Sequence, residues 1–215
     1  MLVIGEQGLA VSRVLCIGAH PDDIEIGCGG SLLALLERRP GISVNWIVMS
    51  GDADRERETR AAADRILRNA GEKHVTLMAF RERYFRYDPA IKQAFDEIGR
   101  TAQPDLVLAP WRGDAHQDHQ VVAELAANTF RDHLILEYEI PKYDGDLGRP
   151  AVFMHLTAAQ AQEKVATLMD CFPSQVQRPW FSDETFRGLM RLRGIESRAP
   201  DGYAEAFHAG KLVLA

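Results

Sequence analysis

The sequence predicts an α/β fold of the Rossmann-like type, in which helices cover both faces of a mostly parallel sheet. Two observations lead to this prediction. Short apolar or β-branched runs alternate with longer segments of helical periodicity along most of the chain, an order typical of βαβ units. The predicted strands are also apolar along nearly their whole length, as are strands that a parallel sheet buries on both faces.

The elements of this pattern follow one another in a regular order. We expect strands at residues 14–19, 44–50, 75–80, 106–110, 134–140 and 151–156. We expect helices at residues 29–38, 54–70, 89–102, 117–130, 158–171 and 182–193. Segments that contain glycine or proline separate these elements, because both residues favour turns. The sequence therefore predicts a single α/β domain over residues 1–215, with a core at about 12–140 that residues 141–215 decorate.

The composition is that of an ordinary globular domain. Of the 215 residues, 46% are hydrophobic and 26% are charged, so the chain can bury a core without disulfides. The three cysteines are too few and too scattered for a disulfide framework. A formal net charge of −6 argues against a nucleic-acid partner. No apolar run is long enough for a membrane span, and the first residues lack a signal-peptide pattern. We therefore expect a cytoplasmic protein, whose oligomeric state the sequence leaves open.

The first polar cluster, AHPDDIEIGCGG, follows the first predicted strand. Ligands of doubly wound sheets bind at the carboxyl ends of the strands, which is where His20, Asp22 and Asp23 lie. The glycines come too late for a dinucleotide-binding turn, and acidic residues occupy the place where a pyrophosphate would approach. Imidazole and carboxylate groups are instead good zinc ligands. Taken alone, the segment is explained equally well by a helix N-cap, in which an aspartate accepts backbone N–H groups.

The second polar cluster, PWRGDAHQDH, follows the fourth predicted strand and is expected at the same edge of the sheet. His116 and His119 are three residues apart, so they face one side where a helix begins. Alone, they fit a polar surface, but two clusters that mix histidine with aspartate at one sheet edge favour a metal site. Two ligands from the first cluster and one from the second would leave a coordination position open for water, which is typical of catalytic zinc.

Both clusters together carry a resemblance to a known family. AHPDDIEIGCGG followed by HQDH resembles the PIG-L (LmbE-like) family of zinc-dependent N-deacetylases. Arg55 with Glu58 and the segments LEYEIP, CFPSQ and YAEAF resemble further parts of that family, so the resemblance extends over about residues 14–208. The sequence departs at one position, where the family's usual acidic residue after the two aspartates is Ile24, with Glu25 one place later. Some members share this form.

The resemblance implies a role for each residue of the two clusters. It implies three metal ligands, namely His20, Asp23 and His119. The expected metal is Zn²⁺, and Fe²⁺ or another divalent ion suits similar ligands. The resemblance makes Asp22 the general base for the activated water, His116 the group that stabilises or protonates the tetrahedral species, and Asp118 a residue that orients a histidine. Arg55 is a candidate for binding the substrate or for pairing with Glu58.

The expected function is removal of the acetyl group from an N-acetylamino sugar, such as N-acetylglucosamine, or its conjugate by metal-activated water. A metal ion lowers the pKa of bound water and polarises the amide carbonyl, and the leaving amine needs a proton from an acid. The sugar rests on the resemblance alone, because the residues by themselves lead only to metal-assisted hydrolysis of a small polar substrate. Two alternatives remain. One is an amidase for another small amide, such as a thiol conjugate, and the other is a noncatalytic metal- or nucleotide-binding domain.

Overall fold

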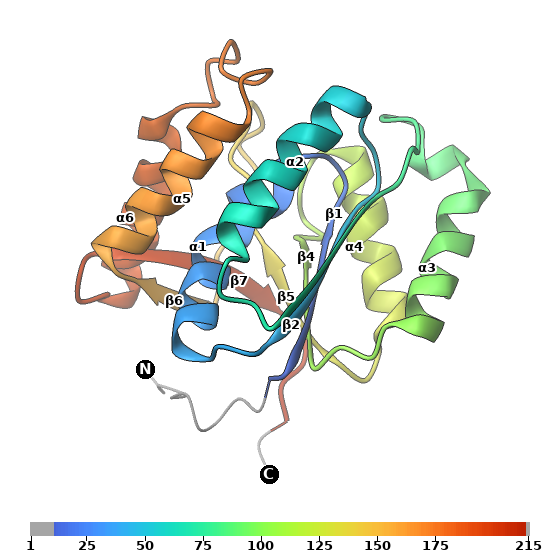
Figure 1. Ribbon diagram of the computed structural model, residues 1–215, viewed down its shortest axis with the longest axis horizontal. Coiled ribbons are helices and arrows are strands. Elements are labelled where there is room, and N and C mark those ends of the chain that lie inside the picture. Colours follow the sequence, from blue (N-terminus) through green and yellow to red (C-terminus); the bar gives the residue numbers. More distant parts are fainter. Residues whose placement is uncertain (1–10, 214–215) are drawn as a thin grey trace.

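The computed structural model describes residues 11–213, which form a seven-stranded sheet in the order β3-β2-β1-β4-β5-β7-β6 (Figure 1). The strands are β1 (Arg13–Gly18), β2 (Ser43–Val48), β3 (Glu72–Leu77), β4 (Leu106–Pro110), β5 (Leu134–Tyr138), β6 (Val152–Leu156) and β7 (Tyr203–Ala209). Strands β1 to β5 pair in parallel, and β7 runs antiparallel to both of its neighbours. The predicted α/β fold with a mostly parallel sheet is therefore confirmed.

Helices cover both faces of this sheet (Figure 1). One face carries α3 (Pro89–Thr101) and α4 (Gln117–Thr129), and the other carries α1 (Asp23–Arg38), α2 (Ala53–Ile66), α5 (Ala158–Cys171) and α6 (Asp183–Ser197). Central strand β1 shows why its sequence is apolar throughout. Val14 and Cys16 belong to the core under the α1 face, whereas Leu15 and Ile17 belong to the core under α3 and α4. Successive side chains of a strand point to opposite faces, so a strand covered on both sides has no polar side.

The strand order places the two polar clusters side by side. β1 pairs with β2 on one side and with β4 on the other, so the winding of the chain reverses between β1 and β4. In doubly wound sheets this reversal opens a crevice at the carboxyl ends of the two strands. His20 follows β1 and His116 follows β4. The topology therefore brings together two segments that lie far apart in the sequence.

Helix α1 starts at Asp23, several residues before the predicted start at residue 29. Glycines disfavour helix interiors, but here they allow close packing. A Cβ atom on Gly27 would lie 2.1 Å from the ring of Tyr138, and one on Gly30 would lie 2.6 Å from Leu156. Close contact with the sheet therefore decides the conformation of this segment.

Two further expectations were inaccurate. Strand β3 occupies Glu72–Leu77 rather than 75–80, and a strand that we did not predict, β7, lies between β5 and β6. The last third of the chain thus supplies two strands of the same sheet rather than a decoration of it. β7 was missed because the sequence YAEAFHA includes a glutamate, and Glu205 is buried together with its ion-pair partner Lys164 (Nζ to Oε1 2.6 Å).

Within residues 11–213, no helix combines the length and the apolar character that a membrane span requires. The expectation that a signal peptide is lacking rests partly on residues 1–10. These residues lie outside the part of the chain that the structure describes.

Candidate active site

The loop after β1 folds back on itself through Asp23. Oδ2 of Asp23 accepts the backbone N–H groups of Ala19 (2.8 Å) and His20 (2.9 Å), which leaves Oδ1 without a backbone donor. Asp22 stands at the N-cap position in the left-handed region, with φ 95°, and its side chain makes no capping hydrogen bond. The structure thus does not support the interpretation of these two aspartates as a simple helix cap.

The loop after β4 is held in a similar way by its own side chains. Oδ1 of Asp114 accepts the backbone N–H of His116 at 2.7 Å. His116 is the N-cap residue of α4, and its Nδ1 accepts the backbone N–H of Asp118 at 3.2 Å. His119 follows in the first turn of the helix and is buried. Helix α4 therefore begins in such a way that both histidines reach the crevice.

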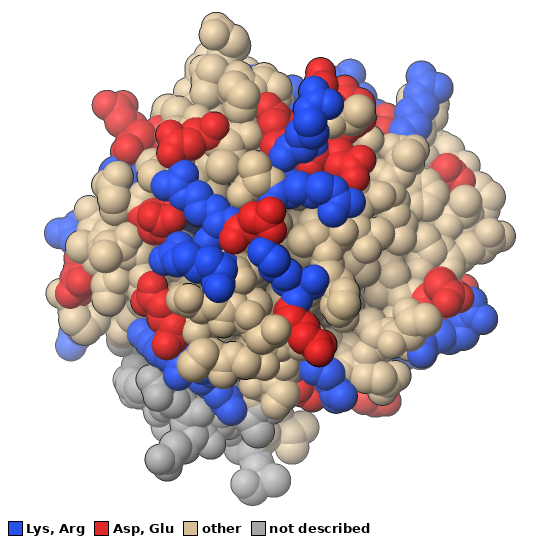
Figure 2. All heavy atoms as spheres, viewed as in Figure 1, with Lys and Arg blue, Asp and Glu red and all other residues tan. Residues whose placement is uncertain are grey.

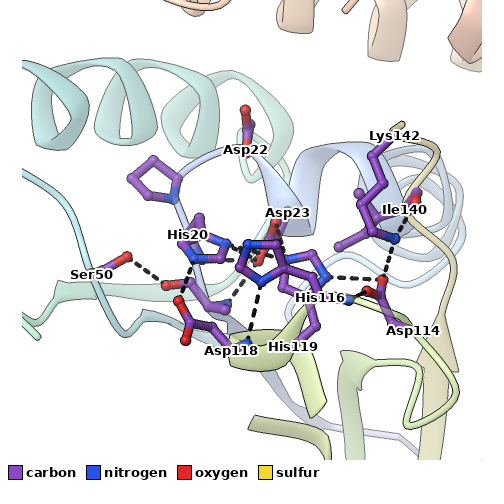
Figure 3. A network of polar contacts seen from close by, with 12 residues as sticks. His20, Asp22, Asp23, Ser50, Asp114, His116, Asp118, His119, Ile140 and Lys142 are labelled. Atoms are coloured by element: carbon purple, nitrogen blue, oxygen red, sulfur yellow. Dashed lines mark hydrogen bonds and ion pairs between the residues drawn. The ribbon is translucent and has the colours of Figure 1, made fainter. Parts of the chain in front are cut away.

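His20 and His119 face each other across the crevice, with His20 Nδ1 3.1 Å from His119 Nε2 (Figure 3). The other nitrogen of each ring contacts a carboxylate. His20 Nε2 lies 3.2 Å from Asp118 Oδ2, and His119 Nδ1 lies 2.9 Å from Asp114 Oδ2. These carboxylates favour tautomers with the proton on the outer nitrogen. In these tautomers both inner nitrogens are available as ligands, as in metal-binding histidines backed by carboxylates.

A third donor group, the carboxylate of Asp23, lies beside this pair of nitrogens. Asp23 Oδ1 is 3.4 Å from His119 Nε2, and Asp23 Oδ2 is 3.7 Å from His20 Nδ1. In a tetrahedral zinc site with bonds of about 2.0–2.1 Å, neighbouring ligand atoms lie about 3.3–3.4 Å apart. His116 is near as well, because one nitrogen from each of the three histidines fits within a span of 4.8 Å. The residues present therefore fit a divalent ion, with Asp23 or His116 beside the facing histidines.

The charges around His119 show that this cluster attracts a cation. Burial lowers the pKa of His119, but Asp23 and Asp114 outweigh burial and raise it to about 10. Burial raises the pKa of Asp23, but His119 and His20 hold it below its ordinary value. Burial also raises the pKa of Asp114, but His119 and Lys142 outweigh burial and hold it below its ordinary value. Several carboxylates thus stabilise positive charge at one buried point.

The pKa values of Asp22 and His116 are shifted in opposite directions. Burial raises the pKa of Asp22 to about 7, although Arg55 opposes this shift. Burial lowers the pKa of His116 to about 4, and the neighbouring His119 and His20 add to this effect. Asp22 therefore titrates near neutral pH, whereas His116 is neutral there.

Arg55 lines the same cleft, but protein atoms occupy its donors. Nη1 donates to Glu58 Oε2 at 2.6 Å and to Ser174 Oγ at 2.9 Å. Nη2 donates to the carbonyl of Pro21 and lies 3.1 Å from Asp22 Oδ2. The arginine thus pairs with Glu58, as one of the two expectations had it, and also reaches Asp22.

The structure adds two residues to which the sequence analysis assigned no role in the site. Asp114 backs His119, and Lys142 Nζ contacts Asp114 Oδ2 at 2.8 Å (Figure 3). Lys142 Nζ also contacts Asp146 Oδ2 at 2.6 Å. Asp146 also accepts the backbone N–H of Ala115 at 2.7 Å, which ties the loop after β5 to the loop after β4. The position of Asp114 shortly before His119 is a local signal. The contact of Lys142 with Asp114 has no such signal, because the two residues are 28 positions apart in the sequence.

The cleft above the cluster has a volume of about 150 Å³ and is open to solvent. Its lining includes all the predicted site residues except Asp118, which lies behind His20. From segments beyond the two clusters the lining adds Arg55, Glu82, Arg83, Ile140, Lys142, Gln175, Arg178 and Trp180. The cleft is therefore built from the loops after β1 and β4, with walls from other parts of the chain.

Comparisons with known proteins identify a family and relatives of this chain. Residues 15–130 match the family described as PIG-L: GlcNAc-PI de-N-acetylase. The "Uncharacterized deacetylase YaiS" of Escherichia coli (strain K12) is 34% identical over 140 residues, which cover 60% of this chain and 74% of that protein. The diacetylchitobiose deacetylase of Thermococcus kodakarensis is 31% identical over 131 residues, which cover 54% of this chain and 48% of that protein. The match thus spans about half the length of the latter relative.

A solved structure shows the same fold over nearly the whole chain. The conserved protein TT1542 from Thermus thermophilus superposes with a TM-score of 0.76 at 21% identity, and the match covers 94% of this chain and 96% of that one. The family match includes both polar clusters and more than half of the sequence. As the resemblance of its motifs implied, the chain belongs to the PIG-L family.

Proposed function

We propose that this protein is a metal-dependent hydrolase that removes the acetyl group from an N-acetylamino sugar or its conjugate. The observation that carries this proposal is the pair of inner imidazole nitrogens of His20 and His119, 3.1 Å apart, with Asp23 beside them at the floor of a cleft. Membership of the family and the diacetylchitobiose deacetylase among the relatives support the class of substrate.

Within the proposal, His20, Asp23 and His119 would hold a zinc ion. Bound there, the ion would lower the pKa of water and polarise the amide carbonyl of the substrate. Asp23 suits the third ligand position, because its Oδ1 lies 3.4 Å from His119 Nε2, close to the edge of a tetrahedral site. His116 already uses Nδ1 to accept the N–H of Asp118.

Asp22 takes the proton of the attacking water and returns it to the leaving amine. A pKa of about 7 suits both steps, because the group is ionised often enough to accept a proton and acidic enough to release it. Arg55, at 3.1 Å, keeps part of the carboxyl population ionised despite its burial. Asp22 thus acts first as the base and then as the acid.

His116 donates a hydrogen bond to the tetrahedral species. Its Nδ1 accepts a backbone N–H, so the neutral ring carries its proton on Nε2. Its pKa of about 4 leaves no proton to transfer at neutral pH. Of the two roles that the resemblance implied, stabilisation is therefore favoured over protonation. Such a donor contributes about 10²–10³-fold to turnover.

The proposal is tested by measuring metal content and acetate release from N-acetylglucosamine and N,N′-diacetylchitobiose. We expect His119→Ala to lose both the metal and the activity. We expect His116→Ala to keep the metal and to lose about 10²–10³-fold in turnover. Loss of metal from His116→Ala would instead identify the three histidines as the ligands.

Two other outcomes favour the alternatives. Hydrolysis of other small amides without acetate release from any N-acetyl sugar would support the amidase. A protein that is loaded with metal and hydrolyses no amide would support a noncatalytic binding domain.

A further inference from the structure

Four cationic side chains line the cleft, and they differ in how their charge is balanced. Carboxylates neutralise Arg55 and Lys142, the first through Asp22 and Glu58 and the second through Asp114 and Asp146. The guanidinium groups of Arg83 and Arg178 make no hydrogen bond or ion pair within the described part of the chain. Two positive charges at the rim of the cleft therefore lack a protein partner.

Several arginines elsewhere on the surface pair with carboxylates. On the face covered by α2 and α5, basic and acidic side chains alternate (Figure 2). Arg65 pairs there with Glu163 (2.9 Å) and Asp170 (2.7 Å), and Arg68 also reaches Glu163. Among the described residues, the two arginines of the cleft lack such pairs, as do the exposed Arg38, Arg149 and Arg198, but unlike those three they line the cleft.

The backbone of Arg83 is strained, and residues of the candidate metal centre hold it. Its φ of 68° lies in the left-handed region, which is unfavourable for a residue with a Cβ atom. Its N–H donates to Asp118 Oδ2 at 2.6 Å, and its carbonyl accepts from Gln117 Nε2 at 3.1 Å. The same oxygen of Asp118 contacts His20 Nε2 at 3.2 Å. Strain that neighbouring groups maintain is common at functional positions.

Arg178 extends into the cleft from a different part of the chain, after α5. Its N–H donates to the carbonyl of Gln175 at 2.9 Å, and its own carbonyl accepts the N–H of Phe181 at 2.9 Å. Gln175 and Phe181 are both buried. The backbone of Arg178 is therefore fixed on both sides, as that of Arg83 is, although both side chains are exposed.

Guanidinium groups match the geometry of phosphate and carboxylate, which they bind through paired N–H groups. We propose that Arg83 and Arg178 form a subsite for an anionic group, a phosphate or a carboxylate, carried by the substrate. This inference rests on the proposed function. Asp23 and His119 lie at the buried floor, each with 4% of its side chain exposed, whereas the arginines stand at the rim. The anionic group therefore belongs to the part of the substrate that carries the amine, not to the acetyl group.

Glu82 is the carboxylate at this rim that has no partner in the described residues. A carboxylate accepts hydrogen bonds from sugar hydroxyls, so Glu82 suits the neutral part of the same substrate. With one carboxylate against two guanidinium groups, the rim keeps an excess of positive charge.

The test compares three probes with the metal-loaded protein: N-acetylglucosamine, N-acetylglucosamine 1-phosphate and N-acetylmuramic acid. We expect KM to be at least about tenfold lower for one or both anionic probes than for the neutral one. Arg83→Met and Arg178→Met should each reduce this preference by about tenfold. Arg86→Met is the matched control, because Arg86 is exposed in the same loop but does not line the cleft. The preference should also weaken as salt is added.

The two anionic probes separate a phosphate from a carboxylate ligand. Equal KM values for all three probes in the unmodified protein, or a preference that both arginine variants retain, would overturn the subsite while the proposed function stands. If no probe releases acetate, the proposed function fails. In that case calorimetric binding of the anionic probes still decides the subsite, since weaker binding by the arginine variants supports it and unchanged binding rejects it.

Discussion

Arg55 Nη2 lies 3.1 Å from Asp22 Oδ2, so a cation in the first turn of α2 contacts the carboxyl group that we propose as the general base. The arginine is held from behind by Glu58 and Ser174. Burial raises the pKa of Asp22, and Arg55 limits the rise to about 7. The pair therefore sets the pH range in which Asp22 can accept a proton.

Replacement of this arginine should move the pH profile. Without the cation, the charged form of Asp22 is less stable, so its pKa rises. We expect Arg55→Met to shift the acidic limb of kcat/KM upward by about one pH unit or more, with a matching loss at neutral pH. Arg57→Met, an exposed position of the same helix, is the control. An equal loss of activity at every pH would mean that Arg55 acts only on folding or on substrate binding.

The two adjacent aspartates should respond differently to substitution. Asp22→Asn should keep the metal and lose about 10²–10⁴-fold in kcat, because the base is removed. Asp23→Ala should lower the affinity for zinc, because it removes the ligand oxygen beside His119. Zinc titration and steady-state kinetics on both variants measure this division. The reverse pattern would exchange the two roles.

Asp114 should influence zinc binding through His119. Its Oδ2 lies 2.9 Å from His119 Nδ1, so it orients the ring and favours the proton on the outer nitrogen. We expect Asp114→Asn to weaken zinc affinity by about 10–100-fold. Asp146→Asn is the control, since Asp146 contacts the same Lys142 but not His119. Equal losses in both variants would attribute the effect to the loop rather than to the histidine.

Lys142 should matter for stability. Its side chain is 8% exposed and lies between the carboxylates of Asp114 and Asp146. Lys142→Met leaves both carboxylates without their cation, which should lower the free energy of unfolding by about 3–5 kcal/mol. Denaturant unfolding measures this loss. Lys73→Met, which breaks an exposed pair with Asp64, should change stability by less than about 1 kcal/mol.

Glu25 should make stability depend on pH. Its side chain is fully buried, and neither oxygen has a hydrogen-bond partner among residues 11–213. Burial raises its pKa well above the ordinary value, so the folded state binds a proton that the unfolded state has already released. Stability should therefore fall as the pH rises above the range of an ordinary carboxyl group. The slope within this window is about 1.4 kcal/mol per pH unit.

We expect Glu25→Gln to remove this slope, so that the variant gains thermal stability over the unmodified protein as the pH increases. Melting temperatures from about pH 5 to pH 8 measure the effect. Glu72→Gln, at an exposed position, should show no such trend. Parallel curves for Glu25→Gln and the unmodified protein would show that water or another group satisfies Glu25.

The sequence by itself determined the α/β class of the fold and the edge of the sheet at which the two polar clusters lie. Strands β1 and β4 are short apolar runs, and each is followed by a cluster of histidine and aspartate. Hydrophobic periodicity is a local property, and the rule that parallel strands end at one edge then brings His20 and His119 together. The motif resemblance supplied the expected roles, which the geometry of the two histidines accommodates.

Tertiary structure decided the features that depend on distant partners. β7 is a strand because β5 and β6 offer it edges, and Glu205 is tolerated within it because Lys164 lies alongside. The early start of α1 depends on the ring of Tyr138, which the glycines of the helix admit. Asp114 and Lys142, which lie behind His119, come into contact only when the loops after β4 and β5 are folded. No local pattern encodes such contacts, because each arises from side chains that the folded backbone brings together.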